Sequence, residues 1–184
     1  MENRQLITAC KKNDANAQRE LYETYAPRMM GLCLKYCKNY EAAEDLLHDG
    51  FLKVFTQIKT YSGRGSFEGW MRRVFVNTVL EHFRKEKNKY LMISDLEEVQ
   101  EESWDENLER LFNDDITEET LLSMIQEMPD GYRTVFNLYV FEEMSHKEIA
   151  KKMGIKENAS RSQYSRARSY LRNKLNGYLI KDNG

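Results

Sequence analysis

Arginines and serines alternate near the C-terminal end of this sequence, in the stretch ENASRSQYSRARSYL, and they are the side chains best suited to chemistry. Ser160, Tyr164, Ala167 and Leu171 recur at helical spacing, which predicts one face turned toward a core. The opposite face carries guanidinium groups and small hydroxyls, which suit phosphate contacts and guanine reading in the DNA major groove. These outward positions are Arg161, Ser162, Ser165, Arg166 and Ser169. The pattern predicts a DNA-binding helix.

A shorter helix is expected directly before it. Ser145 and Glu148 match the capping-box pattern that starts a helix, and Gly154 falls where the chain must leave that helix with a positive φ. Two helices joined by such a turn are typical of a helix-turn-helix. Ser160 is the exception to the pattern, because a branched apolar residue is usual at a core-facing position.

Catalytic and metal-binding patterns are absent from the sequence. It has no Gly-rich phosphate loop, no paired-histidine motif and no nucleophile elbow, and its three histidines are isolated from one another. Cys33 and Cys37 lie four residues apart in a helical pattern without a second ligand pair, so we expect reduced, packed thiols. We therefore predict a protein that is not an enzyme, with no cofactor, no metal and no small-molecule substrate.

The elements that must position these residues are helical throughout. The chain has 184 residues with only 2 Pro and 9 Gly, and its apolar residues recur three or four apart. Its net charge of -2 conceals a segregation: residues 1–90 carry 16 basic and 11 acidic side chains, whereas residues 91–128 carry 1 and 13. We predict an all-α protein of two small helical domains, 1–90 and 117–184, joined by an acidic flexible linker at 91–116. A short helix at 104–112 is one option within that linker.

The first domain should contain two long helices and a loop before a third. Leu21, Tyr25, Met29, Leu32 and Tyr36 form one apolar stripe, and Leu47, Phe51, Val54, Phe55 and Ile58 form another. Gly63 and Gly65 mark a break, after which Ser66 would cap the third helix. No segment resembles a signal peptide or a membrane span, so the expected location is the cytoplasm, without direct membrane insertion.

At this point the chain resembles bacterial RNA polymerase sigma factors, namely the extracytoplasmic-function (ECF) group of the sigma-70 family. YEAAEDLLHDGFLKVF is similar to the polymerase-binding helix, YSGRGSFEGWMRRVFVNTVLEHFRK to the segment that melts and reads the minus-ten element, and EEMSHKEIAKKMGIKENASRSQYSRARSYLRNKL to the region 4 module that reads the minus-thirty-five element. The resemblance covers nearly all of residues 5–178 outside the linker. It implies a region 2-like helical bundle and a region 4-like helix-turn-helix domain.

The resemblance also implies partners and contact residues. The expected partners are core RNA polymerase (its β′ and β subunits), promoter DNA and an anti-sigma factor. The implied polymerase-binding residues are Asp45, His48, Asp49 and Lys53; His48 stands where glutamine is usual and Asp49 where glutamate is. The implied minus-ten residues are Tyr61, Ser62, Arg64, Ser66, Arg72, Arg73, Asn77, Arg84 and Lys85, with Tyr61 and Asn77 at the pocket for a flipped base. The implied minus-thirty-five residues are Lys156, Arg161, Ser162, Gln163, Ser165, Arg166 and Arg168.

Other interpretations remain open from the residues alone. A free-standing helix-turn-helix regulator that binds DNA as a dimer would explain residues 117–178, but it gives no reason for the exposed carboxylates of the polymerase-binding helix. A scaffold that binds only protein would leave the arginine-rich helix unexplained. The acidic linker either mimics single-stranded nucleic acid in the RNA-exit path of the polymerase or is a solvating tether.

Overall fold

The computed structural model describes residues 3–90 and 116–182, and these residues form helices and connecting turns without any strand. This confirms the all-α prediction. The contacts divide the chain into two compact units, Met1–His82 and Phe83–Gly184, which are described here one at a time. Residues 91–115, which include the helix predicted at 104–112, lie outside the described part of the chain.

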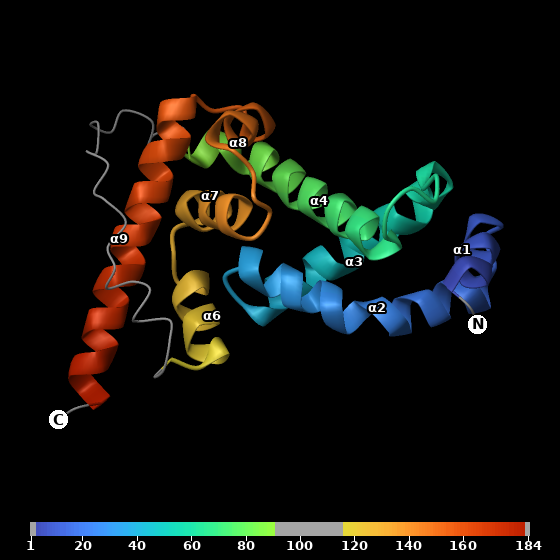
Figure 1. Ribbon diagram of the computed structural model, residues 1–184, viewed down its shortest axis with the longest axis horizontal. Coiled ribbons are helices and arrows are strands. Elements are labelled where there is room, and N and C mark those ends of the chain that lie inside the picture. The colour runs from blue at the N-terminus through green and yellow to red at the C-terminus, as the bar shows by residue number, and fades with distance from the viewer. Residues whose placement is uncertain (1–2, 91–115, 183–184) are drawn as a thin grey trace. The chain divides into compact units, whose positions relative to one another are not determined.

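The first unit is built on α2 (Ala15–Tyr36) and α3 (Tyr40–Gln57), which pack against each other (Figure 1). The short α1 (Asn3–Lys11) packs on α2, and a single 3₁₀ turn, η1 (Ile58–Thr60), follows α3. Asp14 and Asn39 begin α2 and α3, because each side chain accepts a hydrogen bond from a first-turn backbone N–H. The helix α4 (Phe67–Tyr90) begins in this unit and passes its boundary. Ser66 caps α4 as predicted, accepting from Gly69 N at 3.0 Å.

The core of the first unit follows the predicted stripes. All five residues of the α2 stripe are buried, and of the second stripe only Phe55 is partly exposed. Phe51 lies at the centre, edge-on to the Phe75 ring of α4 with the ring centroids 5.4 Å apart. Cys33 is fully buried, and burial raises the pKa of its thiol, which keeps that thiol protonated. The described cysteines are all unbridged.

The second unit packs α7 (Asp130–Val140) and α8 (His146–Met153) against the long α9 (Glu157–Asp182), with α6 (Glu118–Gln126) also on α9 (Figure 1). The capping box of Ser145 and Glu148 is present, and its hydrogen bonds lower the pKa of the Glu148 carboxyl. Gly154 ends α8 with φ 68°, in the left-handed region that favours glycine. The two helices and the turn predicted between Met144 and Arg168 are therefore present.

The turn between α6 and α7 is held by a buried arginine. Arg133 is only 4% exposed, and its guanidinium donates to the carbonyl oxygens of Gln126 (2.7 Å) and Met128 (3.0 Å) while pairing with Asp130. The positive charge therefore satisfies the end of α6, where backbone carbonyls have no partner within the helix. The sequence showed no sign of this role, since arginine is usually a surface residue.

Replacing Arg133 by methionine should lower the free energy of unfolding by about 2–4 kcal/mol, because the carbonyls of Gln126 and Met128 and the Asp130 carboxylate lose their buried partner. Urea unfolding of the full chain followed by circular dichroism measures this loss. The matched control is Arg161→Met on an exposed face of α9, which should change stability by no more than about 0.5 kcal/mol. Equal unfolding midpoints for the two variants would show that Arg133 does not hold the turn.

Candidate nucleic-acid and partner-binding sites

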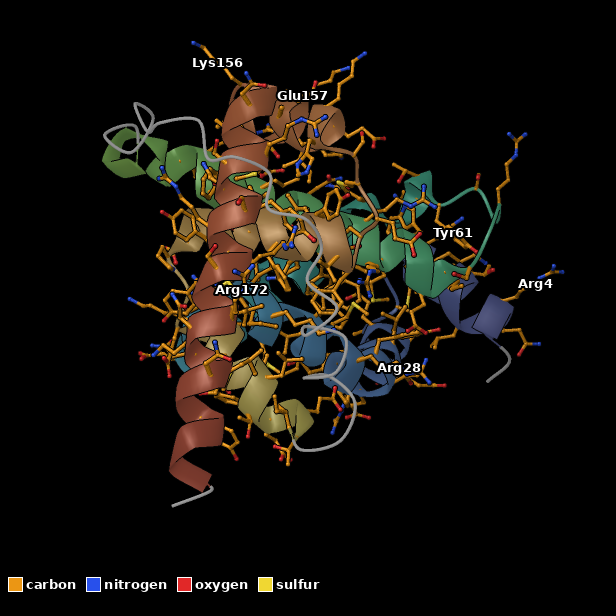
Figure 2. All side chains as sticks on the ribbon, turned by 60° about the vertical axis from the view of Figure 1, so that its left-hand side comes forward. Arg4, Arg28, Tyr61, Lys156, Glu157 and Arg172 are labelled. Atoms are coloured by element: carbon orange, nitrogen blue, oxygen red, sulfur yellow. The ribbon has the colours of Figure 1, made fainter. Side chains whose placement is uncertain are left out.

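The predicted DNA-binding face of α9 is on the outside of the second unit. Ser160, Tyr164 and Ala167 are buried, whereas Arg161 is exposed and Ser162, Ser165 and Arg166 are partly exposed. Figure 2 shows Lys156 and Glu157 projecting from the start of this helix. Arg161 forms an ion pair with Glu157 at 3.0 Å, within one turn of α9. The outer face of α9 therefore presents a guanidinium and small hydroxyls, with the exposed Lys156 just before the helix, an arrangement suited to contact with DNA.

A hydrogen bond between the two helices of the motif explains the unusual serine. Ser160 Oγ lies 3.0 Å from His146 Nδ1, and both side chains are buried. The His146 ring also stacks on Tyr139 of α7, with centroids 4.6 Å apart and planes 15° apart. The polar pair therefore fixes α8 against α9 and satisfies two groups that would otherwise be buried without partners. Neither residue's role was predicted, because they are 14 positions apart in the sequence.

Two predicted contact residues lie on the flanks of α9 instead. The amide oxygen of Gln163 is buried and reaches Gly131 of α7, since a Cβ at Gly131 would stand 2.9 Å from it. The Arg168 guanidinium lies 5.8 Å from the Tyr164 ring centroid, within cation–π range. Gln163 therefore contacts α7, whereas the cited contact of Arg168 lies within α9, and the DNA contacts of both remain a prediction.

Two exposed lysines of α8 were not among the predicted DNA-contact residues. Lys147 and Lys151 are four positions apart and both exposed, so they share one side of the helix that precedes the turn. In helix-turn-helix proteins this first helix crosses the DNA backbone, where lysine suits phosphate contact. The i, i+4 spacing of the lysines was the available signal.

Of the four predicted polymerase-binding residues of α3, two are exposed and two contact side chains of α4. Asp45 and His48 are exposed. Asp49 instead lies 3.0 Å from His82 Nε2, and Lys53 pairs with Glu81 at 2.5 Å, so both are tied to α4. Leu52, which was not predicted, is 52% exposed one turn after His48. An exposed leucine beside carboxylates is an arrangement suited to a protein partner.

A hydrogen bond within the loop between η1 and α4 holds that loop closed. The Tyr61 hydroxyl donates to the Gly65 carbonyl at 2.8 Å, and Gly63 and Gly65 take φ of 81° and 75°, in the region that favours glycine. Ser62, Arg64 and Ser66 are exposed along this loop. The Tyr61 ring packs edge-on against Phe67, with centroids 5.1 Å apart.

An aromatic cluster supports this loop from α4. Trp70 stacks on the buried Phe67 with centroids 5.4 Å apart, and it lies 5.8 Å from the Tyr61 ring. Trp70 itself is only partly buried. Tyr61 and Trp70 therefore each leave part of a ring open to solvent beside the loop.

The predicted residues of α4 lie on more than one side of the helix. Arg73, Asn77 and Arg84 are exposed at i, i+4 and i+11, so they share one side, and Lys85 is exposed next to them. Arg72 is partly buried and points to a different side. The shared side is suited to following a nucleic-acid backbone with the Asn77 amide among the cations.

The described residues hold neither a membrane-spanning helix nor a metal-binding cluster. Within residues 3–90 and 116–182 no helix has the length and apolar character needed to cross a membrane. The same residues contain no group of three or more His, Cys, Asp or Glu side chains placed to hold a metal ion.

Comparison with known proteins matches both units. Residues 21–89 match the family Sigma-70 region 2, and residues 118–171 match Sigma-70, region 4. The chain is 30% identical over 158 residues to the ECF RNA polymerase sigma factor SigE of Mycolicibacterium smegmatis, covering 85% of this chain and 60% of that protein. It is 25% identical to the ECF RNA polymerase sigma factor SigW of Bacillus subtilis, covering 92% of this chain and 94% of that protein.

Among solved structures, one similar chain is the sigma factor RpoE from Bartonella quintana, crystallised with the anti-sigma factor NepR. It is 17% identical with a TM-score of 0.48, covering 85% of this chain and 94% of that one. The two family matches occur in the order of the two units and together span most of the described residues. The protein therefore belongs to the ECF group of the sigma-70 family of RNA polymerase sigma factors.

Proposed function

We propose that this protein is an alternative sigma factor, which binds core RNA polymerase through its β′ and β subunits and directs it to specific promoters. The observation that carries the proposal is that one chain matches both region 2 and region 4. The region 4 match lies on a helix-turn-helix whose arginines and serines face outward. The protein acts in the cytoplasm and is not itself an enzyme. Nucleotidyl transfer stays with the polymerase core.

The two domains have different roles. Residues 1–90 dock on the polymerase through the exposed side of α3, which includes Asp45 and His48. They melt and read the minus-ten element with the 61–66 loop and α4. Residues 117–184 read the minus-thirty-five element with the outer face of α9. The acidic residues 91–116 link the two domains. An anti-sigma factor holds the protein inactive until a signal releases it.

Size-exclusion chromatography of the purified chain with bacterial core RNA polymerase tests the first half of the proposal. A stable complex of one chain per polymerase is expected, and its elution should not change when the helix-turn-helix face is mutated. If the chain binds DNA alone as a dimer, with half-site symmetry, and has no affinity for core polymerase, it is a free-standing regulator.

Replacing Arg166 by alanine should weaken promoter recognition by about 1–3 kcal/mol at one base pair while leaving affinity for core polymerase unchanged, because the guanidinium is on the outer face of α9. Binding of the holoenzyme to promoter variants substituted at each minus-thirty-five position locates that base pair. Arg19→Ala on α2 of the first unit is the control, and it should leave discrimination intact. A uniform loss of affinity across all variants would assign Arg166 to phosphate contact instead of base reading.

A further inference from the structure

Lys53, the only lysine or arginine of α3, is paired with a residue of α4. The carboxylates of α3 are Glu41, Glu44, Asp45 and Asp49. Asp49 stands one turn before Lys53, at the i, i+4 spacing that favours an ion pair within a helix. Lys53 Nζ instead binds Glu81 Oε2 at 2.5 Å. Glu81 therefore holds the ammonium on α4 and away from the Asp49 carboxylate.

The Asp49 carboxylate has a hydrogen-bond partner of a different kind. His82, the residue after Glu81, places its Nε2 atom 3.0 Å from Asp49 Oδ2. An ionised carboxylate only accepts hydrogen bonds, so the ring nitrogen is the donor, and a neutral imidazole can donate without cancelling the carboxylate charge. Two consecutive residues of α4 thus contact one carboxylate and one ammonium of α3.

The ion pair of Lys53 and Glu81 contributes little to the stability of the fold. The exposed fraction of the side chain is 28% for Lys53 and 48% for Glu81, so water screens the attraction. Surface pairs of this kind have only a small effect on the free energy of unfolding. The main consequence of the pair is therefore the charge that α3 presents to a partner.

We propose that Glu81 is a positioning residue for polymerase binding, which keeps Lys53 from neutralising the acidic side of α3. The acidic side of α3 consists of Asp45 and Asp49, which lie one turn apart and are both implied polymerase contacts. The proposal rests on the proposed function, because a side with two carboxylates complements a basic surface of the polymerase. Glu81 was not among the residues that the resemblance implied.

In this account Lys53 influences polymerase binding only through its charge. Without the Glu81 carboxylate, the Lys53 ammonium is one turn from Asp49 and can pair with it. That pairing would cancel one of the two charges of the acidic side of α3. It would also place a cation against a basic partner surface, which is unfavourable.

Competition of unlabelled variants with the labelled wild-type chain for core RNA polymerase tests the role of Glu81. Glu81→Gln keeps the size of the side chain and removes its charge, and it should weaken binding about tenfold at about 0.1 M salt, with a smaller loss at higher salt. Lys53→Met should strengthen binding about threefold, because Glu81 then adds an uncancelled carboxylate beside the acidic side of α3. The double variant Glu81→Gln/Lys53→Met should return to within about twofold of the wild type, since both charges of the pair are gone.

The two single variants separate the proposal from two other roles of the pair. If the Lys53 ammonium itself binds the polymerase, Lys53→Met weakens binding and Glu81→Gln does not. If the pair only supports the fold, both single variants and the double variant lose affinity together, and their unfolding midpoints in urea fall. Either result would overturn the role proposed for Glu81.

Glu23→Gln is the matched control, because it also frees one cation and raises the net charge by one. Glu23 pairs with Arg19 at 2.8 Å, and both side chains are exposed on α2. A loss of affinity equal to that of Glu81→Gln would assign the effect to net charge and contradict the proposal. If the wild-type chain does not bind core polymerase, the proposed function fails as well; if it binds and Glu81→Gln matches it, only the role of Glu81 is wrong.

Discussion

Replacing Gly50 by alanine is expected to unfold the first unit or to lower its free energy of unfolding by about 3 kcal/mol or more. An alanine Cβ at this position would overlap the Phe75 ring, standing 2.5 Å from its Cδ1 and Cζ atoms. Phe75 has no exposed surface, and its ring is edge-on to Phe51, so it has no free space to move into. The glycine thus lets α3 approach α4 at the place where the unit's core is assembled.

Urea unfolding followed by circular dichroism measures this effect, and two further variants make the result specific. Gly31 lies inside α2 with nothing within 4 Å of an added Cβ, so Gly31→Ala should stabilise the protein by about 0.5–1 kcal/mol. Adding Phe75→Leu to Gly50→Ala should recover part of the loss, because the smaller side chain leaves room for the methyl group. If Gly50→Ala were as stable as Gly31→Ala, the close packing of α3 on α4 would be wrong.

Reversing the charge of Asp45 with lysine should weaken binding to core polymerase about 30- to 1000-fold, or about 2–4 kcal/mol. Asp45 is an exposed carboxylate of the implied polymerase-binding side of α3, whereas Asp49 is already paired with His82. A like charge placed against a basic partner surface costs several kcal/mol. Competition with a labelled wild-type chain for core polymerase measures the change.

Glu119→Lys is the control for Asp45→Lys, since it makes the same change of charge at an exposed position of α6 in the second unit. It should leave affinity for the polymerase within about twofold. Asp49→Asn should have a smaller effect than Asp45→Lys, because the Asp49 carboxylate already contacts the His82 ring and is less exposed than Asp45. Equal losses for Asp45→Lys and Glu119→Lys would mean that net charge, and not the α3 surface, governs the association.

The helices and the turn of the motif were predictable because their signals are local. The capping box of Ser145 and Glu148, the left-handed Gly154 and the Ser66 cap each depend on residues within four positions of one another, and all three are present. The buried stripe of α2 was equally clear, because a helix of 22 residues repeats its apolar side several times.

The contacts that set the candidate sites were not predictable, because each joins residues far apart in the sequence. Asp49 meets His82 across 33 positions, and Lys11 meets Tyr61 across 50. A polar residue at a core position was visible at Ser160, but its partner His146 lies on another helix. Gln163 was placed on the DNA face by the resemblance to region 4, and its amide reaches Gly131 through tertiary packing that helical spacing alone does not encode. Pairings of this kind depend on how helices cross.

The most direct test of the central claim is in vitro run-off transcription by core RNA polymerase with and without the purified chain, on a library of randomised promoters. We predict transcripts that depend on the added chain and start downstream of a shared motif with two elements, one for the 61–66 loop and α4 and one for α9. Arg166→Ala should alter the upstream element only. No chain-dependent transcripts, despite stable binding of the chain to symmetric DNA half-sites, would contradict the account and identify a free-standing regulator.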